Sequence, residues 1–184
     1  DPLTESNQIG YQGTYEIEIP GYPSSIETLG DENPSFQYRE QSEILFRGKG
    51  EIQDGKFISK FFLPPSSREE EFISQIRMIA MNPQTKVESF GSEKYSVADG
   101  ADSSLDEEGP EIQIYINGNA PSSQAFPSQT LLTKIDLKDI SGIDISGQTP
   151  GQEIKVQING GDFIILNDEF YAADNDFKSG SLEF

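Results

Sequence analysis

The chain has 184 residues, of which 13 are basic and 32 acidic, and its formal net charge is −19. It contains no cysteine and no histidine, which excludes disulfides, thiol nucleophiles, imidazole catalysis and cysteine or histidine zinc sites within the chain. The negative charge repels nucleic acid and anionic membrane surfaces, and no stretch approaches the roughly 20 apolar residues of a membrane span. We therefore expect a chain that is not an enzyme, binds no nucleic acid and does not insert directly into a membrane.

The first half of the chain contains three segments in which apolar and polar residues alternate. They cover residues 11–19, 43–53 and 56–63, and a period of two is typical of half-buried strands. Asp54-Gly55 separates the last two segments, and an Asp-Gly pair tolerates the positive φ of a two-residue hairpin turn. The pattern predicts a hairpin over residues 45–63. We expect the first core to be filled by the aromatic residues Phe46, Phe57, Phe61 and Phe62.

The stretch PPSSREEEFISQIRMIAMNP, residues 64–83, fits two different structures. Ser66 followed by Glu69 can cap a helix, and the apolar residues of Phe72–Met81 share a helical face. However, Ile76, Met78 and Ala80 also alternate as in a strand. Periodicity alone leaves the choice open.

Residues 91–109 are rich in serine, acidic residues and glycine, and only KYSVA fits a strand there. We therefore predict a first module at residues 1–100, an acidic linker at 101–109 and a second module at 110–184. Segments of strand length in the second module cover residues 111–117, 131–137, 153–158 and 162–166. The composition of Asn159-Gly160-Gly161 predicts a hairpin turn between the last two, and Pro110 suits the first residue of a strand.

These elements predict an all-β fold made of two tandem immunoglobulin-like β-sandwich modules. The sequence shows neither a βαβ alternation nor a phosphate-binding glycine loop. The chain begins at Asp1 without a leader and ends on the strand-like GSLEF, so we expect it to be a piece of a longer protein.

Short motifs follow one another along the chain in a defined order. In the first half they are Phe46-Arg47-Gly48-Lys49, Asp54-Gly55-Lys56-Phe57 and Leu63-Pro64. In the second half they are Gly109-Pro110-Glu111-Ile112, a corner with Asp139, Gly142 and Ile143, Leu166-Asn167-Asp168 with Phe170, and Phe177-Lys178 with Gly180. In these motifs the chain resembles the region that follows the peptidase domain in the type IX secretion system sortase of Bacteroidetes, the PorU family of gingipain-type cysteine peptidases.

The resemblance implies an extracellular location at the cell surface, associated with the outer membrane. Members of this family remove the C-terminal signal domain of secreted cargo and join the cargo to anionic lipopolysaccharide, using a cysteine and a histidine in a domain N-terminal to this region. The implied role of this chain is a non-catalytic spacer and protein-docking module. Its implied partners are the peptidase domain of the same parent chain and other outer-membrane components of type IX secretion.

Two details of the resemblance affect the predicted structure. The corresponding family segment is extended at Phe72–Met81, which favours a strand there. Gln152 and Glu153 stand where the family often has His-Asp, and further family strands do not follow. The second module would then be an incomplete sandwich with an open edge, which is prone to pair with another chain.

Two ligand hypotheses stand beside the docking role. Calcium prefers six to eight oxygen ligands, and the candidate ligands are Asp102, Asp106, Asp174 and Asp176; a hydrated acidic surface explains the same residues. An extracellular adhesin or carbohydrate-binding module is the alternative function, and the rings available for sugar stacking are Tyr11, Tyr15, Tyr22, Phe36 and Tyr38. The lack of tryptophan weakens the carbohydrate hypothesis. No catalytic or cofactor-binding residue is predicted.

Overall fold

The computed structural model describes residues 10–21, 23–30, 34–41, 43–63, 72–97, 108–121, 130–147 and 153–184. In the first half of the chain the strands are β1 Gly13–Pro20, β2 Ser24–Glu27, β3 Gln37–Glu40, β4 Ile44–Ile52, β5 Phe72–Met81 and β6 Glu88–Val97. In the second half they are β7 Glu111–Ile116, β8 Thr133–Lys138, β9 Lys155–Gln157, β10 Phe163–Ile165, β11 Tyr171–Ala173 and β12 Asp176–Glu183. A single 3₁₀ turn, Asn167–Glu169, precedes β11 in the described part. The predicted all-β class is confirmed.

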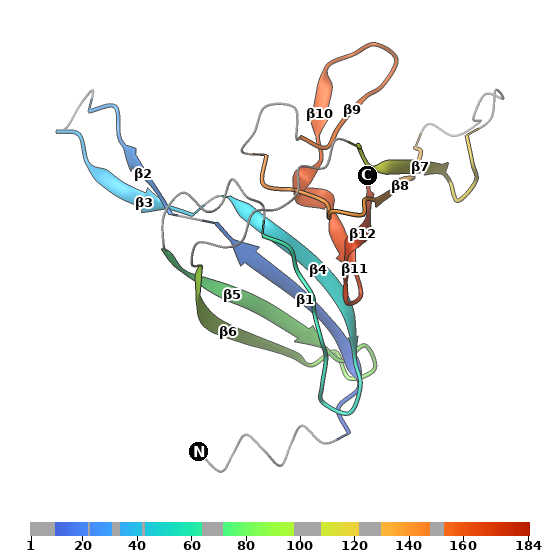
Figure 1. Ribbon diagram of the computed structural model, residues 1–184, viewed down its shortest axis with the longest axis horizontal. Coiled ribbons are helices and arrows are strands. Elements are labelled where there is room, and N and C mark those ends of the chain that lie inside the picture. The colour runs from blue at the N-terminus through green and yellow to red at the C-terminus, as the bar shows by residue number, and fades with distance from the viewer. Residues whose placement is uncertain are drawn as a thin grey trace.

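Eight of these strands form one sheet in the order β6-β5-β1-β4-β11-β12-β8-β7 (Figure 1). Strands of the first half pair with strands of the second at β4 and β11, which run parallel and meet at Gly48 and Ala172. Two short ribbons, β2–β3 and β9–β10, lie outside this sheet. The predicted linker at 101–109 lies outside the described residues except for Glu108 and Gly109, so the division into two immunoglobulin-like modules stays a prediction.

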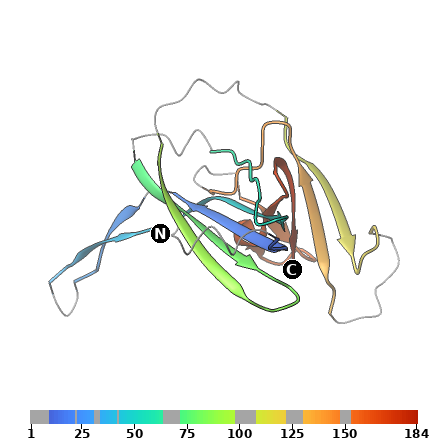
Figure 2. The same ribbon diagram turned by 90° about the horizontal axis from the view of Figure 1, so that it is seen from below.

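The sheet is strongly curved (Figure 2). β5 and β6 form one flank and β7 and β8 the other, with the middle strands between them. Residues 57–63 run between the flanks, and their rings pack on both halves: Phe61 lies 5.9 Å from Phe46, and Phe62 lies 6.2 Å from Phe177, measured between ring centroids. This segment therefore covers the core face of the sheet.

The predicted hairpin over residues 45–63 is half right. The turn is present, because Gln53 and Lys56 exchange backbone hydrogen bonds and Asp54 and Gly55 have φ of 51° and 72°. The prediction of a return strand at residues 57–63 is wrong, because this segment forms no strand. Both sides of β4 are already occupied, by β1 and by β11, so the aromatic segment crosses the sheet instead of joining it.

The strand at Phe72–Met81 is confirmed, and the helix that its composition also permits does not form. β5 pairs with β1 so that Ala80 lies opposite Tyr15 and Met78 opposite Ile17. These alternate residues face the core, where Tyr15 and Ile17 are buried. Pairing on both sides, with β1 and β6, satisfies the backbone of β5 and outweighs its local helix propensity.

One hydrophobic cluster contains buried residues from both halves of the chain. Its members from the first half are Tyr15, Ile17, Ile19, Phe46, Ile52 and Ala80. Its members from the second half are Ile135, Leu137, Ile145, Leu166, Phe170, Ala172 and Leu182. Of the phenylalanines predicted for the first core, Phe46 is buried, Phe61 and Phe62 are half-buried and Phe57 is at the exposed boundary.

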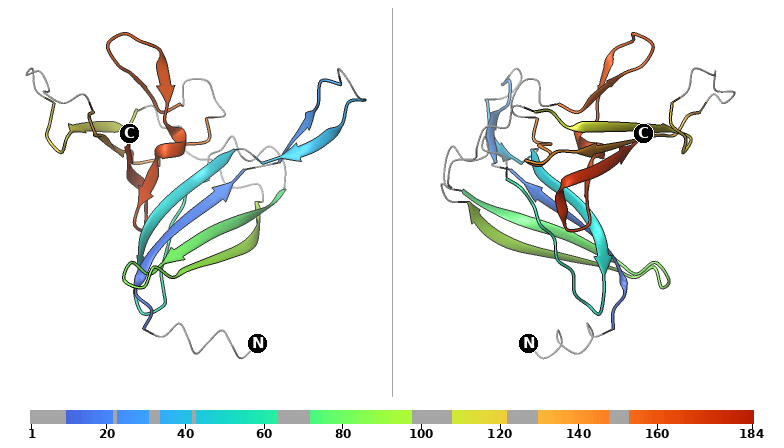
Figure 3. Two further views of the ribbon diagram at one scale, coloured as in Figure 1. Left: turned by 180° about the vertical axis from the view of Figure 1, so that it is seen from behind. Right: turned by 45° about the vertical axis from the view of Figure 1, so that its right-hand side comes forward.

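The predicted strands of the second half are present as β7, β8, β9 and β10, each somewhat shorter than expected. The turn between β9 and β10 is confirmed, with Asn159 and Gly160 at positive φ. Two hairpins were not predicted, namely β2–β3 and β11–β12. The β2–β3 ribbon projects away from the body of the molecule (Figure 1 and the left view of Figure 3).

Candidate functional site

The point where the two halves of the sheet meet is built from small residues. Gly48 is buried on β4, and a Cβ atom there would lie 2.8 Å from the Phe46 ring and 3.4 Å from Ile17. Glycine at this position therefore leaves room for the Phe46 ring, at the point where Ala172 of β11 lies opposite. Because only one residue pair joins these strands, backbone pairing alone holds this junction weakly, and side chains must contribute.

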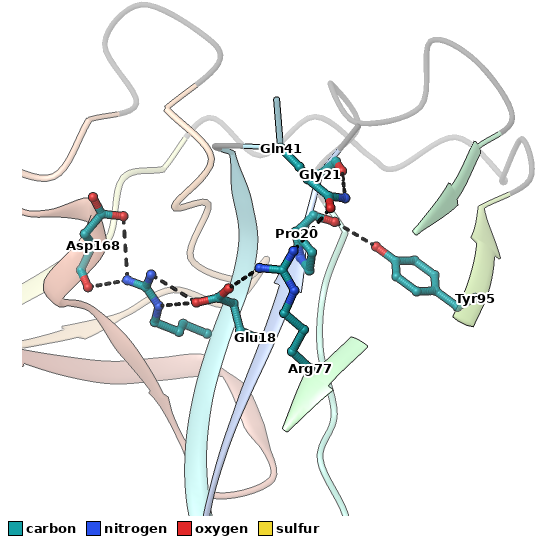
Figure 4. Close-up of polar contacts among 8 residues, drawn as sticks. Glu18, Pro20, Gly21, Gln41, Arg77, Tyr95 and Asp168 are labelled. Carbon is teal, nitrogen blue, oxygen red and sulfur yellow. Dashed lines mark hydrogen bonds and ion pairs between the residues drawn. The ribbon is translucent and has the colours of Figure 1, made fainter. Parts of the chain in front are cut away.

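Arg47 supplies a side-chain link across the junction, between Glu18 and Asp168, which Figure 4 labels. Its Nη2 donates to Glu18 Oε2 on β1 at 3.2 Å. Its Nη1 lies 3.6 Å from Asp168 Oδ1 and also donates to the backbone carbonyl of Asp168, just before β11. The Arg47 side chain is only 16% exposed, so its hydrogen bonds to the partly buried Glu18 are stronger than those of a surface pair. The Asp168 carboxylate is 86% exposed, so water screens that ion pair and the bond to the Asp168 backbone carbonyl carries more of the link.

The network continues from Glu18 away from the junction. Arg77 Nη1 on β5 donates to Glu18 Oε1 at 3.3 Å, so one carboxylate lies between two guanidinium groups. Arg77 Nη2 donates to Gln41 Oε1, and Gln41 Nε2 donates to the carbonyl of Gly21 at 2.7 Å (Figure 4). These contacts connect β5, β1 and β4, and the contacts of Arg47 with Asp168 extend the network to the 3₁₀ turn of the second half.

Tyr171 lies beside Arg47 on the same face of the sheet, which we call the junction face. Lys49 Nζ lies 5.0 Å and Arg47 Cζ 5.9 Å from its ring centroid, within range of cation–π attraction. Burial raises the pKa of the Tyr171 hydroxyl, with a smaller contribution from Glu16. The hydroxyl therefore stays protonated and neutral at physiological pH.

A groove of about 500 Å³ opens on the junction face next to Tyr171 and extends to β8 and β7. Its charged lining residues are Lys49, Lys134, Lys138, Glu111, Asp136 and Asp174. Lys134 Nζ lies 2.8 Å from Asp136 Oδ1, and this hydrogen bond raises the pKa of Lys134. With both signs of charge interspersed, the groove creates no strong field for one class of charged ligand.

The described part of the structure does not place the four predicted calcium ligands together in one site. Asp102 and Asp106 lie outside them. Asp174 Oδ1 accepts a hydrogen bond from the buried Tyr15 hydroxyl at 3.1 Å, and Asp176 Oδ2 accepts one from Ser179 Oγ at 2.6 Å. Within the described ranges no three acidic side chains are grouped so that they could hold a metal ion. Calcium binding stays a prediction.

The rings considered for sugar stacking lie in different places. Tyr15 is 1% exposed and belongs to the core, and Tyr11 is half-buried against it. Tyr22 lies outside the described residues. Phe36 immediately precedes β3 and Tyr38 lies within it, both on the projecting ribbon, and their side chains are 66% and 41% exposed. Carbohydrate binding also stays a prediction.

The β2–β3 ribbon carries an exposed apolar group, of which sequence reasoning named Phe36 and Tyr38 but not the hairpin that carries them. Besides Phe36 and Tyr38, it includes Leu29, which is 91% exposed in the connection between the two strands. The sequence signal for the β2 strand was weak, because Ser24–Glu27 contains a single isoleucine. The pairing of Ile26 with Tyr38 nevertheless joins the only two large apolar side chains within these strands.

Comparison with protein-family models, curated proteins and solved structures found no match. The resemblance to the secretion sortase therefore rests on the sequence motifs alone. In the part of the chain that the structure describes, no helix has the length and apolar character needed to cross a membrane. The class that fold and site define is an all-β protein whose halves are joined through one sheet, a shared core and side-chain contacts that include the Arg47 network and the Tyr15–Asp174 hydrogen bond.

Proposed function

We propose that this chain is the non-catalytic β-sandwich region of a cell-surface type IX secretion sortase, where it acts as a structural spacer and as a docking module for the peptidase domain of the same parent. Because it contains no cysteine, it cannot itself be a cysteine-based catalytic unit. The observation that carries the spacer role is the unbroken sheet from β6 to β7, fastened at its centre by Arg47.

Two further observations support the proposal. The resemblance implied an extended Phe72–Met81, where local composition also allowed a helix, and the segment is a strand. A spacer must also keep its two ends at a constant separation, and the shared core and the Arg47 network oppose hinge motion between the halves.

The docking role is assigned to the exposed apolar group of the β2–β3 ribbon. This ribbon directly follows β1 in the chain and is therefore close in sequence to the N-terminal end. Leu29, Phe36 and Tyr38 are exposed within this ribbon and the connection between its strands, and projecting aromatic side chains are effective anchors for a partner's pocket.

The first experiment is to read the coding sequence upstream of Asp1 for a cysteine–histidine peptidase domain, whose absence contradicts the parent assignment. In the second, the Phe36→Asp and Tyr38→Asp double variant is titrated against the isolated peptidase domain by calorimetry. We expect it to bind at least tenfold more weakly than the wild type, whereas the control Ile140→Asp, at a position 77% exposed elsewhere, binds normally. Equal binding of both variants would refute docking through the ribbon.

A further inference from the structure

β7 is an edge strand of the sheet in the described part of the chain. Its pairing with β8 shows which of its residues direct their backbone groups toward β8 and which direct them outward. Asn117 N donates to Leu132 O in this register. Hydrogen-bonded residues alternate along an antiparallel ladder, so Tyr115, Gln113 and Glu111 direct their backbone groups toward β8. Ile112, Ile114 and Ile116 direct theirs outward, away from the sheet.

The open part of this edge is short and bounded at both ends. Ile116 exchanges both its outward backbone groups with Asn119, with N–O distances of 2.8 and 3.1 Å. Pro110, at the other end, has no N–H to donate. The outward donors and acceptors that lack a partner among the described residues are therefore those of Ile112 and Ile114.

The side chains of the same two residues continue the apolar face of the sheet beyond the core. Ile112 lies opposite Leu137 and Ile114 opposite Ile135, and both β8 residues are buried. Ile112 is 60% and Ile114 41% exposed. The edge thus presents unpaired backbone groups and exposed apolar side chains at the same positions, which is the combination that favours strand addition.

We propose that β7 pairs in antiparallel orientation with β7 of a second copy of the chain, about a two-fold axis that passes between the two copies of Gln113. In this register Ile112 and the partner's Ile114 form a hydrogen-bonded pair, and the symmetric pair forms on the other side of the axis. The isoleucines then continue one apolar row across both sheets. This surface is separate from the β2–β3 ribbon, so the inference goes beyond the proposed docking function.

The sequence of β7 matches this pairing with itself. Glu111 falls opposite the partner's Tyr115, and the partner's Lys134, which lies over that ring at 5.9 Å in each copy, places a positive charge beside the carboxylate. Gln113 faces the partner's Gln113, so no like charges meet at the axis. The intermolecular pairing ends before Ile116, because Asn119 already occupies its outward side, so the partner's Pro110 lies beyond the ladder and its missing donor costs nothing there. Interfaces of this kind, with one patch facing itself, are the commonest in homodimers.

The overall charge makes a distinguishing prediction. Each copy carries a net charge of −19, so two copies repel at long range, and added salt screens this repulsion. We expect dimerisation to strengthen as salt increases. A partner strand of basic character would bind more weakly in salt.

Cysteine cross-linking tests the register, and the natural chain adds no background because it contains no cysteine. Residues facing each other in a non-hydrogen-bonded pair have Cβ atoms about 4.5–5.5 Å apart, so Gln113→Cys should form a covalent dimer rapidly under mild oxidation. Glu111→Cys is the matched control on the same strand, because its copies would lie roughly 13 Å apart. Ser92→Cys, an exposed position on the edge strand β6, is the control for the opposite edge.

The result that supports the proposal is cross-linking at least tenfold faster for Gln113→Cys than for both controls, together with a concentration-dependent mass for the wild type in sedimentation equilibrium that Ile114→Lys abolishes. Loading concentrations of roughly 10 µM to 1 mM suit the weak affinity of a small interface. Cross-linking at equal rates in all three variants, or a monomer at every concentration and salt, would overturn it. Rapid cross-linking of Ser92→Cys alone would instead assign self-association to β6.

Discussion

Phe170→Ala offers the most direct test of whether the two halves form one cooperative unit. Phe170 is 2% exposed, immediately precedes β11 and belongs to the cluster that spans both halves. Removing a buried phenylalanine ring costs about 3–5 kcal/mol, the lost transfer free energy plus the energy of the cavity. Total stabilities of single domains are about 5–15 kcal/mol, so we expect a folded variant that has lost a large fraction of its stability.

The informative measurement is which segments of the chain lose stability in this variant. Urea unfolding followed by circular dichroism gives the free-energy change, and native-state hydrogen exchange resolves it by segment. If the sheet and core act as one unit, amides of β5, which is remote from Phe170 in the sheet order, should lose about the same protection as amides of β8. A decrease of about 3–5 kcal/mol corresponds to faster exchange by a factor of roughly 10²–10⁴ in both strands.

Independent unfolding of the two halves would give a different exchange pattern. If β8 and β12 exchange faster in Phe170→Ala while β5 and β6 keep wild-type protection, the halves unfold independently. The argument from the shared core would then be refuted, and the predicted division into two modules would be supported. Leu29→Ala is the control, because Leu29 is 91% exposed and its truncation should change stability by less than about 0.5 kcal/mol.

Three further predictions concern polar contacts. Arg47→Met should lower the free energy of unfolding by about 1–3 kcal/mol, since it leaves partly buried acceptors unpaired; an unchanged urea midpoint would show that the junction does not depend on it. Tyr15→Phe removes a hydrogen bond to Asp174 and should cost about 1 kcal/mol in the same assay, an effect that should vanish in an Asp174→Ala background if the contact is responsible. The pKa of Asp176 is lowered from 3.8, mainly by the hydrogen bond from Ser179, so its stabilisation is complete above 3.8 and lost as pH falls through the lower folded value. Ser179→Ala should therefore destabilise the protein at pH 7 by up to about 1 kcal/mol, with a difference that shrinks in acid; a difference that grows in acid would contradict this assignment.

Several elements were predictable because their signals are local. The Asp54-Gly55 turn follows from the residues that tolerate positive φ, and the same chemistry is visible at Asn159-Gly160. The alternating isoleucines of β7 predicted a strand, and its apolar residues do share one face. The missed β11–β12 turn has a similar local signal, since Asn175 adopts a φ of 54° between short alternating segments.

The junction could not be predicted in this way. Arg47 and Asp168 are 121 residues apart in sequence, and neither has a neighbourhood that indicates the other. The segment at residues 57–63 shows the same limit, because its alternation is real but the pairing position beside β4 is taken by β11. Whether a strand-like segment joins a sheet depends on which edges remain open, and that is a property of the whole fold.

By itself the sequence determined the all-β class, the positions of several turns and the exclusion of thiol and imidazole chemistry, because propensity, turn geometry and side-chain chemistry act over a few residues. The tertiary structure alone decided that β4 meets β11, that Arg47 bridges the two halves and that Ile112 and Ile114 are left at an open edge. The backbone hydrogen-bonding groups are the same for every residue except proline, so the choice of strand partner is decided by the burial and chain closure of the entire molecule.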